Sequence, residues 1–341
     1  MPGIRVAHVG LGPIGCAIAK QIAGQRAFTI VSAVDIHPSK VGKDAGEIVG
    51  LSRRLGVRVE DNTGKALEAS RPDIVVHCTS SSLERVMPEL ETILAAKCAI
   101  VSTTEELVYP LHAHRRLARR IDAVAKRERV SVLGTGVNPG FAMDALPIML
   151  TAVCERVDRI VINRVQDACS RRRPFQEKIG AGLTRAEFQR QVKLGGVRHV
   201  GMTESIAMIA DALGWRLDRV TDRVRPKVAG APVASEFLSV DAGHVCGIVQ
   251  DAVGYRNGDP AIQLHLEAYL GAPETYESVE IEGVPRLSMT MPGGIHGDIA
   301  TASVVVNSIP KVLAAQPGLH TMRDLALPSF SPRTGRLRSL A

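Results

Sequence analysis

Short apolar runs alternate with longer amphipathic stretches over residues 1–140. The runs VAHVG, FTIVSAVD, DIVVHCT, AIVSTT and VSVLGTG are rich in β-branched residues, as are the buried strands of parallel sheets. Helical spacing of apolar positions occupies residues 12–25, 83–96 and 111–129. Because strands that alternate with helices form βαβ units, this pattern predicts an α/β domain with a parallel sheet.

The pattern changes after residue 140. The segments ERVDRIVINRVQDA, SVDAGHVCGIVQDAVGY and AIQLHLEAYLGAPETYESVEIEG are typical of longer strands in an open, partly solvated mixed sheet. Helices are expected at TRAEFQRQVKLG and at TESIAMIADALGW, the latter with Thr203 as its N-cap. We therefore expect a second α+β domain over residues 141–300. A C-terminal helix and tail over residues 301–341, with helical spacing as far as Pro310, should return toward the first domain.

Composition narrows the class of protein. Apolar residues make up 45% and charged residues 23% of the 341, and no apolar run approaches the roughly 18 to 20 residues that a bilayer requires. The N-terminus runs directly into a strand, so we expect no export signal and no membrane partner. The six cysteines are dispersed, without a CxxC pair or a metal-like cluster, which favours a cytoplasmic location and no metal site.

The net charge of +7 raises the question of nucleic acid. Basic residues are dispersed, acidic residues interleave with them, and aromatic residues make up only 3% of the chain. We therefore expect no nucleic-acid partner. An anionic cofactor or substrate accounts for the charge equally well.

A glycine-rich turn, GLGPIG, follows the first strand and precedes a helical stretch. In this context Gly10 permits the tight turn, Gly12 lets the backbone approach a pyrophosphate, and Gly15 lets the helix pack on the strand. The helix N-terminus donates N–H groups to the anion. The turn predicts a dinucleotide-binding Rossmann domain and an NAD(P)-dependent oxidoreductase.

An acidic residue follows the second strand at the distance that this motif requires. Asp35 stands 20 residues after Gly15, where a carboxylate can accept hydrogen bonds from the adenosine ribose. This position favours NAD. Lys40 and Lys43 follow closely, and unless both are merely exposed, either can neutralise a 2′-phosphate. NAD and NADP therefore both stay open as cofactors.

Two acidic residues follow the strand AIV, within STTEEL. Glu105 and Glu106 fall at the carboxyl end of a parallel strand, where open α/β sheets bind ligands. One of them is a candidate base for the chemistry of ammonium, a carbonyl or an imine. The alternative is a helix N-terminus with favourable acidic residues. Asn138, in GTGVNPGF at the next strand end, is a candidate contact for nicotinamide, although this loop also suits a crossover between domains.

Two further segments have both a functional and a structural interpretation. RRRPFQEK, from Arg171, is either a site for a carboxylate or phosphate or an exposed loop. GGIHGD places His296 in a glycine-flanked turn before a helix, where it is either a ligand contact or a surface histidine.

Taken together, GLGPIG, DIHPSKVGKD, STTEELVYP, GTGVNPGFAMDALP, RVQDACSRRRPFQEKIGAGLT and GGIHGDIATASVVVNSIPKVLAAQPGLHTMRDL resemble the 2,4-diaminopentanoate dehydrogenase and native amine dehydrogenase family over nearly the whole chain. The resemblance implies a fold similar to that of dihydrodipicolinate reductase. In that fold an open-sheet domain carries the substrate pocket and pairs subunits into homodimers. It also implies NAD(P)H-dependent reductive amination of a ketone or aldehyde with ammonia, and the reverse oxidative deamination of a primary amine or diamino acid.

The same resemblance implies roles for particular residues. The family's essential glutamate falls on Glu105, with Glu106 beside it. Cys169 stands where serine, threonine or an aromatic residue is commoner, which leaves substrate choice open. The expected substrate contacts are Phe141, Cys169, His296 and Thr301. The expected cofactor contacts are Gly10, Gly12, Pro13, Ile14, Gly15, Asp35, Lys40, Thr79, Ser80, Thr103 and Asn138. Thr79 and Ser80 are expected from their place just past the strand DIVVHC, where the alternative is a plain strand-ending turn.

Two other functions fit the same cofactor domain. A C=N or C=O reductase of the dihydrodipicolinate reductase or homoserine dehydrogenase type would work without ammonia. A dinucleotide-binding sensor or scaffold would bind the cofactor without turnover.

Overall fold

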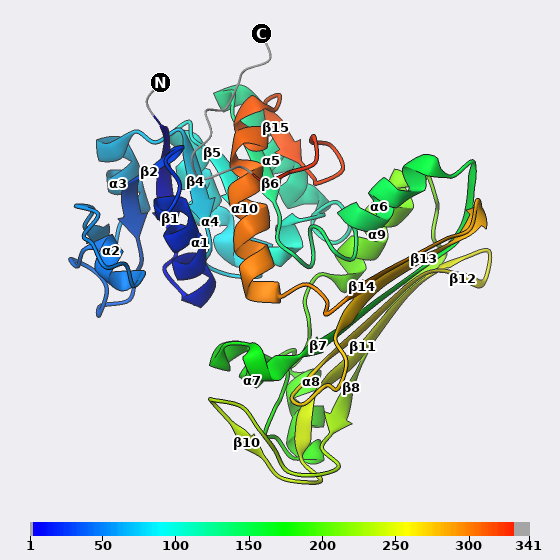
Figure 1. Cartoon of the computed structure of the whole chain (residues 1–341). Coiled ribbons are helices and arrows are strands. Elements are labelled where there is room, and N and C mark those ends of the chain that lie inside the picture. The colour runs from blue at the N-terminus through cyan, green and yellow to red at the C-terminus, as the bar shows by residue number, and fades with distance from the viewer. Residues whose placement is uncertain (1–2, 331–341) are drawn as a thin grey trace. The chain divides into compact units, whose positions relative to one another are not determined.

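The computed structural model describes residues 3–330, which form two compact units. The first unit takes the chain up to Gly140 together with the segment from Asp298 onward, and the second takes Phe141–Gly297. Their helices and strands are labelled in Figure 1. Among the described residues, no helix is long and apolar enough to cross a membrane.

The first unit is built on a seven-stranded parallel sheet in the order β15-β6-β5-β4-β1-β2-β3. This confirms the predicted Rossmann-type sheet and all five of its predicted strands. The two short strands at the edges, β3 and β15, were not predicted. The strands are β1 (Ile4–Val9), β2 (Phe28–Val34), β3 (Val59–Glu60), β4 (Ile74–His77), β5 (Ala99–Ser102), β6 (Ser131–Gly134) and β15 (Gly318–His320).

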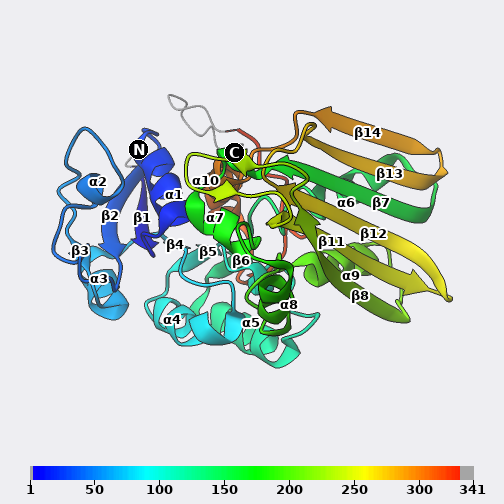
Figure 2. The same cartoon turned by 90° about the horizontal axis from the view of Figure 1, so that it is seen from below.

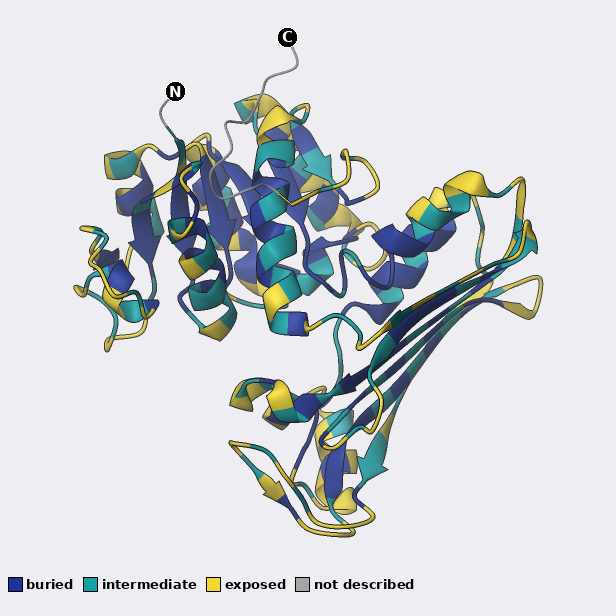
Figure 3. Cartoon of the chain, viewed as in Figure 1, coloured by how far each residue is buried: buried dark blue, intermediate teal, exposed yellow. Residues whose placement is uncertain are grey.

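Helices cover both faces of this sheet (Figures 1 and 2). α1 and α10 lie on one face, where Gln21 Nε2 donates to Ser303 Oγ at 3.2 Å. α3, α4 and α5 lie on the other face, where a buried apolar cluster joins them to the strands (Figure 3). The elements are α1 (Pro13–Ala23), α2 (Ala45–Ile48), α3 (Thr63–Ser70), α4 (Leu83–Ala95), the 3-10 turn η1 (Glu105–Leu107), α5 (Arg115–Glu128) and α10 (Gly297–Ala314).

The last helix extends beyond the predicted limit. Helical spacing predicted an end at Pro310, but α10 continues to Ala314 with Pro310 inside it. A proline removes one backbone hydrogen bond from the helix. Ile309 and Val312 are fully buried, and the Ser131 hydroxyl donates to the Val312 carbonyl at 2.5 Å. These contacts offset the lost bond, because packing contributes more to a helix than its intrinsic propensity does.

The second unit contains a six-stranded mixed sheet in the order β14-β13-β7-β12-β11-β8. Only the β7–β12 pair is parallel among these strands. The predicted open mixed sheet is therefore confirmed, although one long predicted segment is two strands and β8 and β14 were missed. The strands are β7 (Arg156–Asp167), β8 (Arg219–Val228), β11 (Val245–Arg256), β12 (Asp259–Tyr269), β13 (Tyr276–Val284) and β14 (Leu287–Pro292); β9 (Val233–Ala234) and β10 (Ser239–Val240) form a small separate pair.

Short helices complete the second unit. α9 begins two residues earlier than predicted, because Gly201, with φ 108°, is its N-cap instead of Thr203. Thr203 therefore lies inside the helix, where its hydroxyl donates to Glu204 at 2.9 Å. Thr184 does cap α8, in a reciprocal arrangement with Glu187. The elements are α6 (Ala145–Leu150), η2 (Thr151–Val153), η3 (Ala168–Ser170), α7 (Arg173–Lys178), α8 (Arg185–Lys193) and α9 (Met202–Ala212).

Candidate active site

The carboxyl ends of five neighbouring strands in the first unit bring the predicted cofactor residues together. The glycine turn follows β1, Asp35 follows β2, Thr79 follows β4, Glu105 follows β5 and Asn138 follows β6. The chain leaves β1 toward β2 on one side and later adds β4 on the other, so β1 marks a topological switch point, where such sheets bind ligands. Adjacent strands are about 4.8 Å apart, which places β2 and β5 about 14 Å from each other.

The glycine turn has the geometry of a phosphate cradle. A Cβ added to Gly10, whose φ is +90°, would lie 2.4 Å from the Cys78 carbonyl oxygen, and one added to Gly15 would lie 2.0 Å from the Gly10 carbonyl oxygen. A Cβ on Gly12 would meet no protein atom within 4 Å. Gly12 is the N-cap of α1, and no side chain in the described structure caps that end. The residues present therefore fit a dinucleotide pyrophosphate at this helix N-terminus.

Asp35 is held by three neighbours. Its Oδ2 accepts from the Leu11 amide at 2.8 Å and from Lys40 Nζ at 2.8 Å, and its Oδ1 accepts from the His37 amide at 2.8 Å. Burial opposes ionisation, but these hydrogen bonds hold the pKa of Asp35 below its usual value. Lys40 Nζ also donates to the Leu11 carbonyl at 2.9 Å, so its ammonium group lies between the carboxylate and the glycine turn.

The two glutamates after β5 have different surroundings. Glu106 Oε2 accepts from the Leu83 amide, at the first residue of α4, at 2.7 Å. The same oxygen lies 3.1 Å from Nε2 of His114. Glu106 thus ties the η1 turn to a helix N-terminus, where a carboxylate is stabilising. Glu105 begins the same turn and is half-buried.

The turn that carries Glu105 is held closely against β6. A Cβ added to Gly134 would lie 2.5 Å from the Leu107 carbonyl carbon and 2.7 Å from the Val108 nitrogen. Only glycine allows the two backbones to approach so closely. Gly134 was not among the predicted site residues. A glycine at the end of the strand VSVLG could have indicated a close approach of another backbone.

Other predicted cofactor residues lie in the loops that follow β4 and β6. Thr79 Oγ1 lies 2.9 Å from His77 Nε2, and its methyl carbon would be 3.0 Å from a Cβ on Gly10. Ser80 Oγ accepts from the Ser82 amide at 3.3 Å, which makes it part of the turn before α4. In the loop after β6, the Val137 amide donates to Thr301 Oγ1 at 3.3 Å, beside Asn138.

The second unit encloses a separate charged cluster. Arg164 and Glu277, from β7 and β13, form an ion pair with both side chains buried. Arg164 Nη2 also donates to the Ile295 carbonyl at 3.0 Å. Arg171 is buried as well and donates to Gln166 Oε1 at 2.8 Å. The exposed-loop interpretation of RRRPFQEK is therefore wrong for Arg171, because these contacts enclose its side chain.

A histidine lies among the cations of this cluster. Burial, with Lys178, Arg164, Arg171 and Arg198 nearby, lowers the pKa of His199 to about 3. His199 is therefore neutral at physiological pH, and its amide donates to Gln250 Oε1 at 2.8 Å. No sequence pattern distinguished this histidine, because its neighbours come from separate segments.

The predicted substrate contacts of the second unit have varied surroundings. Phe141 is half-buried at the start of the unit, and His296 is exposed. Cys169 lies in η3, where its thiol is 3.7 Å from the Ala234 carbonyl oxygen. Burial raises the pKa of Cys169, so the thiol stays protonated at neutral pH.

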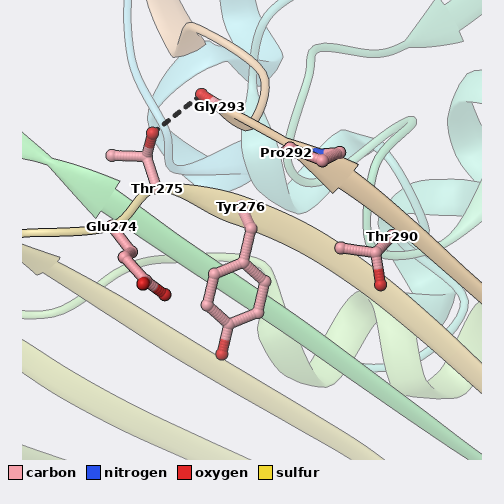
Figure 4. A pocket seen from close by; sticks show the side chains of 6 residues that line it. All are labelled: Glu274, Thr275, Tyr276, Thr290, Pro292 and Gly293. Atoms are coloured by element: carbon pink, nitrogen blue, oxygen red, sulfur yellow. Dashed lines mark hydrogen bonds between the residues drawn. The ribbon is translucent and has the colours of Figure 1, made fainter.

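An open pocket of about 610 Å³ lies at the edge formed by β13 and β14 (Figure 4). Tyr276 is among the residues that line it, and the Thr275 hydroxyl donates to the Gly293 carbonyl at 2.9 Å. Because successive residues of a strand face opposite sides, Tyr276 lies on the sheet face opposite the buried Glu277. None of the predicted substrate contacts lines this pocket.

Both units match models of known protein families. Residues 141–335 match the family model of the 2,4-diaminopentanoate dehydrogenase C-terminal domain, and residues 4–126 match the N-terminal model of dihydrodipicolinate reductase. The chain is 34% identical to a 2,4-diaminopentanoate dehydrogenase of Acetoanaerobium sticklandii, over 96% of this chain and 95% of the relative. It is 24% identical to an amine dehydrogenase of Streptomyces virginiae, over 97% and 98% of the two chains.

A solved structure agrees with these matches. The amine dehydrogenase of Mycobacterium smegmatis superposes with a TM-score of 0.85 at 26% identity, covering 96% of this chain and 97% of that one. The resemblance inferred from the motifs is confirmed, and so is an oxidoreductase with a nicotinamide cofactor that acts on CH–NH2 groups. The chain belongs to the 2,4-diaminopentanoate dehydrogenase family.

Proposed function

We propose that this protein aminates a ketone or aldehyde with ammonia, and deaminates a primary amine in reverse, with Glu105 as the proton acceptor. The observation that supports this proposal is the place of the η1 turn directly after β5, at the strand-end edge where open α/β sheets bind ligands. Glu106 is bound to the α4 N-terminus and to His114, so it stabilises the turn. Glu105 is the position to which the resemblance assigns the essential glutamate, and it follows the strand end where the nicotinamide of a dinucleotide bound at Gly12 would lie.

The chemistry follows from a carboxylate at this place. Glu105 accepts a proton from ammonium, and ammonia then attacks the carbonyl carbon to give a carbinolamine. The proton returns to the hydroxyl group, which leaves as water, and the negative carboxylate stabilises the resulting iminium cation. A bound nicotinamide supplies the hydride that reduces the iminium carbon. The glycine turn and Asp35 hold the other half of the dinucleotide.

The test is a pair of matched substitutions in one turn. Glu105→Gln keeps the shape of the side chain and removes its basicity, so turnover with ketone, ammonium and NADH or NADPH should fall by ~10² or more. The dissociation constant of the cofactor should change little. Glu106→Gln should lower turnover far less. Near-normal turnover of Glu105→Gln would remove Glu105 from this role.

Dependence on ammonium separates this function from its enzymatic rival. In a screen of ketones and oxo acids, amination requires ammonium for every turnover. Consumption of NADH with a ketone alone would favour the C=O reductase instead. Cofactor binding without turnover on any amine or carbonyl would favour a sensor.

The cofactor preference is proposed from the contacts of Asp35. A carboxylate has about four acceptor positions, and Leu11, His37 and Lys40 occupy three of those on Asp35. One acceptor is left for the ribose, while the ammonium of Lys40 is positioned to meet a 2′-phosphate. We therefore propose that the enzyme accepts both NAD and NADP, and that Lys40 supports NADP.

Lys40→Met tests the cofactor proposal. The substitution removes one charge-assisted hydrogen bond and should weaken NADP binding by about tenfold or more. NAD binding should stay the same or become tighter, because an acceptor of Asp35 becomes available. Lys43→Met is the matched control, since Lys43 is exposed in the same loop. An equal loss of affinity for both cofactors would show a purely structural role of Lys40.

Further expectations accompany this function. Phe141, Cys169, His296 and Thr301 stay predicted substrate contacts, and a homodimer stays the predicted assembly, which light scattering of the purified protein would measure. A cytoplasmic location is proposed because all six cysteines are free thiols.

A further inference from the structure

A buried histidine, His77, ends β4, which is the neighbour of β5 in the sheet. Glu105 lies in the η1 turn that follows β5. His77, the last residue of β4, is fully buried and is paired in register with Ser102, the last residue of β5. Its Nδ1 lies 2.9 Å from Ser102 Oγ, and its Nε2 lies 2.9 Å from Glu89 Oε2. Both ring nitrogens are therefore partnered inside the protein, as a buried polar ring requires.

The contacts continue from Ser102 into the η1 turn. Ser102 and Thr104 are both fully buried. The Ser102 hydroxyl donates to Thr104 Oγ1 at 3.0 Å and accepts from the Thr104 amide at 3.1 Å. Thr104 is the N-cap of η1 and directly precedes Glu105, so Ser102 Oγ contacts the residue at which the turn begins.

The contacts that run from Ser102 through His77 end at Glu89, which lies in α4. Glu89 also accepts from the Thr63 hydroxyl at 3.0 Å and from Thr79 Oγ1 at 3.3 Å. Burial opposes ionisation of Glu89, but the hydrogen bonds from His77, Thr63 and Thr79 and the nearby charge of His77 hold its pKa below the usual value. The carboxylate is therefore a fixed, ionised acceptor at neutral pH, and it fixes the plane of the His77 ring.

We propose that His77 is a positioning residue for the reaction, which holds the Glu105 turn in place through Ser102 and Thr104. The proposal rests on the assignment of Glu105 under the proposed function. A carboxylate that must accept a proton is sensitive to its place, since a 1 Å displacement can cost as much as about 10²-fold in rate. Outside its own turn, the Ser102 hydroxyl contacts Nδ1 of His77 at 2.9 Å.

Two amide substitutions separate the two nitrogens of the ring. The side-chain amide of asparagine reaches roughly as far as Nδ1, and that of glutamine roughly as far as Nε2. His77→Asn should keep the bond to Ser102 and retain turnover within about threefold. His77→Gln should keep only the bond to Glu89 and lose about tenfold or more in kcat, with KM and the cofactor dissociation constant little changed. Thr92→Val is the control and should leave kcat unchanged, because the Thr92 hydroxyl donates to the Pro88 carbonyl within α4, at 3.0 Å, and not to Glu89.

A double-mutant cycle identifies the residue through which His77 acts. If His77 works by placing Glu105, His77→Gln should cause little further loss of kcat in the Glu105→Gln background. Ser102→Ala removes the hydroxyl that contacts both His77 and Thr104, and it should also lower kcat by about tenfold. Because this side chain is small, the variant also provides the test if a His77 variant fails to fold.

Three outcomes would overturn the inference: equal kcat for the asparagine and glutamine variants, an undiminished loss in the Glu105→Gln background, or normal kcat for Ser102→Ala. Normal turnover of Glu105→Gln alone would instead reject the proposed function. The two failures are therefore distinguishable.

Discussion

The two units enclose polar groups in different ways. In the first unit, His77, Ser102 and Thr104 come from the ends of adjacent parallel strands, and their contacts follow the order of the sheet. In the second unit, Arg164 and Glu277 lie 113 residues apart in sequence and form an ion pair within the sheet. The first arrangement places a turn at a ligand-binding edge. The second neutralises charges that the core would otherwise exclude, because an unpaired buried charge is costly.

The largest effect should come from breaking the buried pair of the second unit. Glu277→Ala leaves Arg164 buried without its carboxylate and should lower the free energy of unfolding by about 3–5 kcal/mol. Glu282 lies on β13 like Glu277, and it pairs with Arg159 of β7, but both of these side chains are more than a third exposed. Glu282→Ala should therefore lower the free energy of unfolding by less than about 1 kcal/mol. Urea unfolding of the two variants measures both values. Equal losses would contradict the distinction between buried and exposed pairs.

Acid should act on a buried neutral group of the first unit. Burial lowers the pKa of His8 to about 4 from 6.5, so the folded protein keeps this ring neutral while the unfolded chain takes up a proton. The associated stability is complete above pH 6.5 and is lost as the pH falls from 6.5 to 4, by about 3 kcal/mol in total. His8→Asn should flatten this part of the stability profile, as thermal unfolding at a series of pH values would show. An unchanged slope would exclude His8 as its source.

An added methyl group should disturb the Glu105 turn. In Gly134→Ala the new Cβ collides with the Leu107 backbone, so η1 must shift, at a cost of about 1–3 kcal/mol in stability. Turnover should fall by about tenfold, because Glu105 moves with the turn. Gly64→Ala, whose Cβ would meet no atom closer than 3.5 Å, is the control: it should leave turnover unchanged and raise stability by up to about 1 kcal/mol, because alanine favours the helix α3 more than glycine does. Steady-state kinetics with thermal unfolding measures both; normal turnover of Gly134→Ala would contradict the tight approach.

The smallest effect is expected for the cap on α4. Glu106→Ala removes the acceptor of the Leu83 amide and should cost about 1 kcal/mol of stability. Thermal unfolding of this variant beside Glu105→Ala measures the difference between the two glutamates. A larger loss of stability for Glu105→Ala would mean that the structural role belongs to Glu105.

The strand-end residues of the first unit could be predicted because each follows a short apolar run directly. Asp35, Glu105 and Asn138 were found from this rule, and the glycine turn from its spacing. His77 could not be found in the same way, since it lies within an apolar run and its partner Glu89 is on a helix. The role of Glu106 depends on Leu83, which is 23 residues away in sequence, so no local pattern reveals it.

In the second unit, the strand boundaries and the buried polar residues were harder to predict from local sequence patterns. Its strands alternate in polarity, which predicted the open sheet, but the run of residues 261–283 contains two strands that one pattern did not separate. RRRPFQEK stayed open between an anion site and an exposed loop, because Gln166, which accepts from the buried Arg171, belongs to the preceding strand. Residues that are polar and buried together are determined by pairing across the sheet, and that pairing was not readable from the sequence.

The pairing of β15 with β6 has a consequence for biosynthesis. A ribosome produces the strands β1 to β6 first, and it produces the β15 strand, Gly318–His320, only after the whole second unit. Domains generally fold as units while the chain is made. The second unit, complete at Gly297, can therefore fold before the parallel sheet acquires its last strand, so β6 waits as an open edge during elongation. Chaperone demand for this protein should be concentrated on that edge in nascent chains that end before residue 318.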